Sequence, residues 1–213
     1  MASVENGSAT PTAILDPPPN PLGWTRLDTI SAAIVTVAAG VVRMIGVTTP
    51  PYLYFDEYFY AQEACFLVHH SKAICGIGEH AVTPHPPLGK WLISLGIRAF
   101  GNVPLGWRIG PVIAGTLTVL LLYILARRLL GSTLGAVIAS GLLAIDLLHF
   151  VQSRLGMLDV FATLFVVASF LFLVVDRDRT RAAPEAGRRL MARPWLIAAG
   201  LSAGAAAASK WVG

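Results

Sequence analysis

The sequence predicts an all-α polytopic membrane protein with about five transmembrane helices, and three observations lead to this fold class. Hydrophobic residues make up 55% of the 213-residue chain and charged residues only 13%, whereas soluble domains carry about 25% charged residues. Apolar runs long enough to cross a bilayer as a helix, about 18 residues or more, recur along the chain. The two cysteines are too few for a disulfide scaffold, and the 20 glycines lack the three-residue period of collagen.

The beginning of the chain differs in composition from the rest. Residues 1–28 are polar and rich in proline, so we expect a disordered tail on the cytoplasmic side. Residues 29–213 then form the N-terminal part of a transmembrane domain. The expected spans within it are 29–47, 108–126, 134–151, 157–175 and 195–213. The last span is rich in alanine and glycine, which allow helices to approach closely.

A long segment between the first two spans is too polar to cross the membrane. Residues 48–107 contain four acids, four histidines and both cysteines, and we expect them to form a large outer loop. Two amphipathic stretches, 56–69 and 88–100, are typical of helices lying at the membrane surface. Cys65 and Cys75 could form a disulfide or be two unrelated buried thiols, because their spacing is compatible with both.

The distribution of arginines predicts the orientation. Short loops rich in Lys and Arg stay in the cytoplasm, and here they follow the second and fourth spans. The residues that define these loops are Arg127, Arg128, Arg177, Arg179, Arg181, Arg188, Arg189 and Arg193. The outer loop is therefore expected on the extracytoplasmic face of the cell membrane. The net charge of +4 needs no nucleic-acid partner to explain it.

Ionisable residues gather at the outer ends of the expected spans, where charges are costly and usually mark function. These candidates all lie within a turn or two of the outer interface: Asp56, Glu57, His85, Lys90, Arg108, Arg154, Asp159 and Lys210. A carboxylate there can accept the proton of a hydroxyl nucleophile. Arginine and lysine can bind a phosphate by charge-assisted hydrogen bonds. The pattern indicates a site for an anionic substrate beside a proton acceptor.

Each candidate also has a purely structural interpretation that the sequence leaves open. The acidic pair could be solvated, the histidine and prolines could form a rigid turn, and the cations could contact lipid headgroups. Arg98 in particular favours a headgroup contact. Arg43, near the end of the first span, either snorkels to the interface or faces the bundle. Asp146 could pair with a basic residue on a neighbouring helix.

Four pieces of sequence carry a resemblance to a known family. They are FDEYFY at 55–60, HPPLGK at 85–90, LHFVQSR running into MLD at 148–159, and ASKW at 208–211. In this order the chain resembles the protein O-mannosyltransferases and, more widely, the polyprenyl-phosphate-sugar-dependent glycosyltransferases of the GT-C fold. Members of this family continue with more membrane helices, so the resemblance implies that the chain is a fragment or a truncated product.

The resemblance implies an inverting transfer of mannose from a polyprenyl phosphate to Ser or Thr hydroxyls of proteins. Asp56 then corresponds to the catalytic base, and Glu57 positions the acceptor. The residues expected to bind the lipid phosphate or the sugar are Arg108, Arg154, Asp159, Lys210, His85 and Lys90. We expect no metal ion or other cofactor, since cationic side chains supply the positive charge.

The expected partners are the lipid-linked donor, membrane lipids, and a secreted or translocating protein acceptor, delivered by a translocon such as Sec. Three alternatives remain open at this stage. The chain could transfer another lipid-linked sugar, such as arabinose or aminoarabinose, to a lipid or glycan. It could be part of a transporter, in which case charges near the bilayer midplane are expected. It could also be an inactive membrane scaffold.

Overall fold

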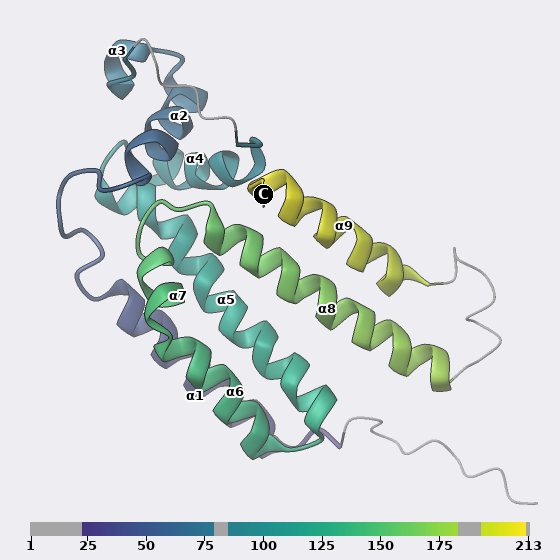
Figure 1. Cartoon of the computed structure of the whole chain (residues 1–213). Helices are drawn as coiled ribbons and strands as arrows, with labels where there is room; N and C mark the ends of the chain where they lie inside the picture. Colours follow the sequence, from purple (N-terminus) through teal and green to yellow (C-terminus); the bar gives the residue numbers. More distant parts are fainter. Residues whose placement is uncertain (1–22, 79–84, 183–192, 212–213) are drawn as a thin grey trace, which may run out of the picture.

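The computed structural model describes residues 23–78, 85–182 and 193–211. Within these ranges all regular structure is helical, which confirms the predicted class. Three described helices are long and apolar enough to cross a membrane: α1 (Arg26–Met44), α5 (Pro104–Leu130) and α8 (Asp159–Ala182). Two more apolar helices are shorter: α6 (Thr133–Ile145) and α9 (Pro194–Ser209). These five helices run side by side in a bundle (Figure 1).

Helix α1 begins at Arg26, before the expected start at residue 29, because a capping box forms there. Thr25 and Asp28 each accept a hydrogen bond from the other's backbone N–H. The Asp28 carboxylate is fully buried and also accepts bonds from Arg127 at 2.7 Å and Thr133 at 2.6 Å. Asp28 therefore joins α1, α5 and α6 at one end of the bundle. The remainder of the expected disordered tail, residues 1–22, lies outside the described residues.

Helix α5 is the centre of the bundle, since it packs against α1, α6, α8 and the outer-loop helix α4 (Leu88–Phe100). It extends beyond the expected span 108–126 at both ends. Pro104 occupies its first turn, where a missing N–H costs nothing. Gly131 ends the helix in the left-handed conformation, with a φ of 64° that favours glycine.

The expected span 134–151 is interrupted. Asp146 has an extended ψ of 122° and separates α6 from the short helix α7 (Leu147–Gln152). Its carboxylate accepts a hydrogen bond from the backbone N–H of His149 at 2.8 Å, which caps α7. Asp146 therefore caps α7, whereas the sequence suggested an ion pair with a basic residue on a neighbouring helix.

Helix α9 lies along α8 (Figure 1). The hydroxyl of Ser169 on α8 donates to the carbonyl of Ala199 on α9 at 3.0 Å, a contact that the small residues of α9 permit. The basic loop between the two helices includes residues 183–192, which lie outside the described residues.

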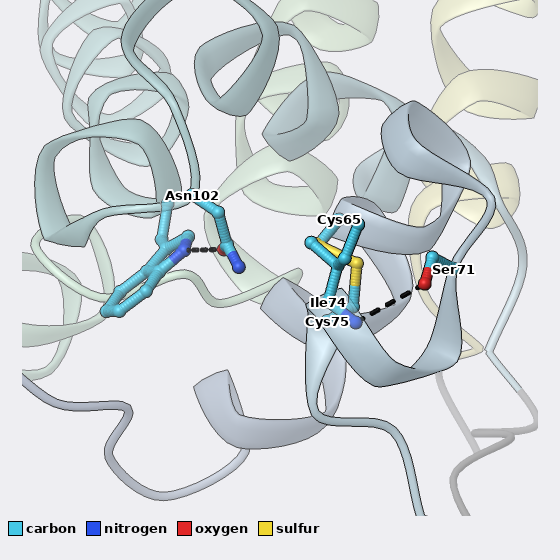
Figure 2. The surroundings of a disulfide bond; sticks show 6 residues. Cys65, Ser71, Ile74, Cys75 and Asn102 are labelled. Carbon is cyan, nitrogen blue, oxygen red and sulfur yellow. Dashed lines mark hydrogen bonds between the residues drawn. A yellow bond between two sulfur atoms is a disulfide. The ribbon is translucent and has the colours of Figure 1, made fainter.

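The outer loop forms a cap of short helices at one end of the bundle (Figure 1). Helices α2 (Glu57–His69) and α4 coincide with the two expected amphipathic stretches. Cys65 in the second half of α2 and Cys75 in α3 (Lys72–Cys75) form a disulfide, one of the two arrangements that their spacing allowed. Figure 2 shows this bond, with the Ser71 side chain capping α3 beside it.

Candidate active site

Glu57, in the first turn of α2, is completely buried in a network of hydrogen bonds. Its Oε1 accepts from Arg108 Nε and from the backbone N–H of Gly156, both at 2.8 Å. Its Oε2 accepts from Arg108 Nη2 at 2.7 Å. A Cβ at Gly156 would lie 3.1 Å from Glu57 Cγ, so only glycine fits there without displacement. We refer to Glu57, Arg108 and Gly156 as the buried clamp.

Arg108 has no donor left for a ligand. A guanidinium carries five N–H donors, and Arg108 uses two of them on Glu57. The other three donate to the backbone carbonyls of Val47, Pro50 and Tyr52 at 2.9–3.0 Å. With an exposed fraction of 0%, the side chain ties the start of the outer loop to α5. The expectation that Arg108 binds a lipid phosphate directly is therefore not supported by its position.

Asp56 lies one residue earlier and is partly exposed. Phe55 has a φ of 56°, which turns the chain just before it. Within the described part of the chain, one hydrogen bond reaches the Asp56 carboxylate, from the hydroxyl of buried Tyr60 at 3.5 Å. Burial, followed by the charges of Asp56 and Asp159, raises the pKa of Tyr60. Tyr60 therefore stays protonated and remains a donor, close to both carboxylates.

Asp159 and Lys210 bring the start of α8 and the end of α9 together. Lys210 Nζ lies 2.6 Å from Asp159 Oδ1, and about a quarter of each side chain is exposed. The second carboxylate oxygen of Asp159 is buried and has no described hydrogen-bond partner. This ion pair is accessible, unlike the one in the buried clamp.

Lys90 and His85 lie close to Tyr60. Lys90 Nζ lies 2.5 Å from Glu63 Oε2 and donates to the His85 carbonyl at 2.9 Å. The His85 ring is 5.7 Å from the ring of Tyr60. Two motifs identified in the sequence, one at the start of α2 and one that runs into the start of α4, are thereby brought into contact. We refer to the whole group as the carboxylate–lysine cluster: Asp56, Tyr60, Glu63, His85, Lys90, Asp159 and Lys210.

Arg154 makes none of its described contacts with this cluster. Its guanidinium donates to the carbonyl of Ile45 at 2.5 Å and lies over the ring of Phe150 at 5.2 Å. It ties the turn before α8 to the end of α1. Arg43 faces the bundle and donates to Ser153 at 2.9 Å, which resolves the question about its direction.

Sequence reasoning missed Tyr60, Glu63 and Gly156. Tyr60 and Glu63 follow Asp56 at positions i+4 and i+7, so a helix over this stretch places all three on one face. That signal was available in the sequence. Nothing local distinguishes Gly156, whose importance arises from the distant Glu57.

A hollow of about 540 Å³ opens beside the carboxylate–lysine cluster. It lies between α8 and α9, and Lys210 is the charged residue among those lining it. The other lining residues are Pro86, Ala162, Val166, Ala206, Ala207 and Trp211. An apolar chain that ends in an anionic group matches this lining. Among residues 23–78, 85–182 and 193–211, no group of His, Cys, Asp or Glu side chains is arranged to hold a metal ion.

Comparisons with known proteins give consistent matches. The family profile described as dolichyl-phosphate-mannose-protein mannosyltransferase matches residues 33–213. A polyprenol-phosphate-mannose–protein mannosyltransferase of Mycolicibacterium smegmatis is 37% identical over 92% of this chain and 41% of its own length. The protein of the same name from Corynebacterium glutamicum is 36% identical over 93% of this chain and 42% of its own length.

A more distant relative is an undecaprenyl phosphate-alpha-4-amino-4-deoxy-L-arabinose arabinosyl transferase of Pseudomonas aeruginosa. It is 33% identical over 46% of this chain and 18% of its own length. The chain thus spans about two fifths of the length of the mannosyltransferases that it matches. No solved structure matches the chain significantly.

Proposed function

Because the chain belongs to the dolichyl-phosphate-mannose-protein mannosyltransferase family, we propose that it takes part in the transfer of mannose from a polyprenyl phosphate to protein hydroxyls. The membership confirms the resemblance carried by the four sequence pieces. The relatives named for this reaction are more than twice as long as the chain. That this chain acts in the same reaction, with Ser or Thr as acceptor, is therefore our proposal.

In the proposed reaction, the acceptor hydroxyl oxygen attacks the anomeric carbon from the face opposite the phosphate. The new C–O bond forms as the bond from that carbon to the phosphate oxygen breaks, so the configuration inverts. The hydroxyl proton passes to the Asp56 carboxylate, and the leaving group is the polyprenyl phosphate. General-base help of this kind contributes roughly 10²–10⁴-fold to a rate.

One observation carries the assignment of Asp56: of the two adjacent carboxylates, it is the accessible one. Glu57 is saturated by the donors of Arg108 and Gly156. Asp56 receives one bond, from Tyr60, and can accept a proton without breaking a buried network. Glu57 and Arg108 are then positioning residues that hold the start of α2 against α5.

Lys210 is our first candidate for the phosphate of the donor, since it is accessible and lines the apolar hollow between α8 and α9. Negative charge grows on that phosphate as it leaves, and a nearby ammonium stabilises it. Lys90 and His85 belong to the same cluster, and we propose that they contact the sugar or the phosphate. Arg154 is a candidate only if it exchanges its bond to the Ile45 carbonyl for one to the ligand.

The Lys210 ammonium would supply positive charge at the phosphate, so we propose that catalysis needs no metal ion. The arginines at the opposite end of the bundle, Arg127 and Arg128, favour an extracytoplasmic location of the cluster in the cell membrane. The acceptor would then be a secreted protein, met during or after translocation by a machinery such as Sec.

The test measures transfer of labelled mannose from polyprenyl-phosphate-mannose to a Ser/Thr peptide, in membranes containing the family protein in its longest available form. Asp56→Asn should lower the rate roughly 100-fold or more, as expected for loss of a general base. The matched control is Asp178→Asn, at the other end of α8, which should leave the rate unchanged. Equal rates in wild type and Asp56→Asn would remove Asp56 from the mechanism.

The same experiment should include a second sugar donor, because the Pseudomonas relative is named for the transfer of a different sugar. Undecaprenyl phosphate-aminoarabinose, offered with a lipid acceptor, should give no product. Transfer from this donor together with none from the mannose donor would assign the chain to the other sugar.

A further inference from the structure

Two hollows meet at Leu95 on α4, the amphipathic helix that lies across one end of the bundle (Figure 1). The first is a groove of about 380 Å³ where α4, α5 and α8 come together. The second, of about 400 Å³, lies between α4 and the end of α2. Leu95 lines both and is 61% exposed, so the two hollows are neighbours on the surface, with this one side chain between them.

The groove between α4, α5 and α8 is suited to a hydrocarbon chain. All its lining residues are apolar or glycine. On α5 the lining runs from Ile109 to Leu117, which is about 12 Å along the helix at 1.5 Å per residue. Ile113 and Leu117 are about half exposed on this path. In a membrane this long apolar path would face the acyl chains of the outer leaflet.

The second hollow, by contrast, carries cationic and polar groups. Arg98, His70 and Ser94 line it together with three apolar residues, and no acidic side chain of the described residues lines it. Arg98 is exposed, and within the described part of the chain its guanidinium has no hydrogen bond or ion pair. A guanidinium at the membrane interface binds phosphate oxygens well, because its donors match their geometry.

This position is separate from the carboxylate–lysine cluster. Lys90, near the beginning of α4, belongs to that cluster and is paired with Glu63. Arg98 lies eight residues further along the same helix, about 12 Å away. A ligand held at Arg98 therefore need not be the sugar donor, whose proposed site is at Lys210.

We propose that the Arg98 end of α4 binds an anionic membrane phospholipid. The headgroup phosphate lies in the hollow at Arg98, and one acyl chain runs past Leu95 into the groove along α5. Charge complementarity favours an anionic headgroup over a zwitterionic one, because no acid among the described lining residues offsets the charge of Arg98. The apolar groove next to the cationic hollow favours a lipid over a free anion, because a free anion would leave the groove unused.

Native mass spectrometry of the chain, purified in detergent and stripped of lipid, tests this proposal. We expect phosphatidylglycerol to bind more tightly than phosphatidylcholine. Arg98→Gln should weaken phosphatidylglycerol binding roughly tenfold, in line with loss of a hydrogen bond to a charged group, and Arg98→Lys should retain most of it. Lys72→Gln, at an exposed lysine of α3 that lines neither hollow, is the matched control and should bind like wild type.

A second pair of variants tests the groove. Ile113→Trp fills it and should weaken binding of both lipids. Ile138→Trp, at a residue of α6 with nearly the same exposure, should not. The proposal is overturned if Arg98→Gln binds like Lys72→Gln, or if the two lipids bind equally. It is also overturned if polyprenyl phosphate at equal concentration displaces phosphatidylglycerol, or if a longer form of the protein no longer binds it.

Discussion

Asp56 and Glu57 carry the same functional group on consecutive residues, yet their carboxylates lie in opposite environments. Glu57 is fully buried and accepts bonds from Arg108 and Gly156, whereas Asp56 is partly exposed and accepts one long bond from Tyr60. The same contrast separates the cations. Arg108 has used all its donors, while Lys210 lies accessible beside an apolar hollow.

This contrast teaches that the type of residue does not decide its role; the number of satisfied donors and acceptors does. A buried ion pair is costly to break from one side only, because the remaining charge is left without a partner. An accessible pair can exchange its partner for a ligand. We therefore expect substitutions in the buried clamp to affect stability and those in the carboxylate–lysine cluster to affect binding and rate.

The largest effect is expected at Arg108. Arg108→Gln should lower the free energy of unfolding by about 3–5 kcal/mol, because it leaves the Glu57 carboxylate buried without a cation. Thermal or chemical unfolding in detergent measures it. Arg177→Gln, which disrupts a partly exposed pair with Asp178, should cost less than about 1 kcal/mol. Similar losses of unfolding free energy in both variants would contradict the distinction between the buried clamp and a partly exposed ion pair.

Gly156 tests the same clamp through shape. Gly156→Ala should lower the free energy of unfolding by about 1–3 kcal/mol, because the added Cβ is forced toward Glu57 Cγ and Oε1. The control is Gly141→Ala on α6, where an added Cβ meets nothing within 4 Å. That variant should be stabilised by about 0.5–1 kcal/mol, since alanine favours a helix. Greater stability in Gly156→Ala would contradict the close fit.

Lys210 tests the expectation that substitutions in the carboxylate–lysine cluster affect binding more than stability. Lys210→Gln should change the stability by less than about 1 kcal/mol, since its pair with Asp159 is partly exposed. If Lys210 binds the donor phosphate, the KM for polyprenyl-phosphate-mannose should rise roughly tenfold, as expected for a lost charge-assisted hydrogen bond. Steady-state kinetics and an unfolding curve on the same preparation separate the two effects. A large loss of stability with an unchanged KM would place Lys210 with the buried clamp.

The stability at high pH depends on Tyr60. Burial, followed by the charges of Asp56 and Asp159, raises the pKa of Tyr60, whereas an unfolded tyrosine ionises near pH 10. Above about pH 10 the unfolded chain thus loses this proton first, and stability falls by up to about 1.4 kcal/mol per pH unit. Tyr60→Phe should show a shallower decline of melting temperature above pH 10. Exposed Tyr54→Phe should keep the wild-type slope, and identical slopes in all three proteins would contradict the raised pKa.

Much of the fold could be predicted from local patterns. The apolar run before Met44 and the amphipathic stretch 88–100 each contain their own signal, and both form helices. The interruption at Asp146 was missed because a single acid in an apolar run is compatible with a continuous helix. Its capping bond to His149 decides the matter, and periodicity does not report such a bond.

The candidate site was only partly predictable. Motif order placed its members on one face, and the structure brings Asp56, His85 and Lys90 together around Tyr60. The same reasoning treated Arg108 as a ligand-binding cation. Its five donors are used by groups 51 to 61 residues away in the chain, which no local pattern reveals.

The sequence by itself determined that this protein is an all-helical membrane protein of the mannosyltransferase family, because span length, amphipathic period and motif order are local properties. Only the tertiary structure decided which carboxylate is free and which is held. Glu57 is 99 residues from Gly156 and 51 from Arg108. Burial and the saturation of hydrogen bonds result from such distant contacts, so the difference between Asp56 and Glu57 emerges only when the chain is folded.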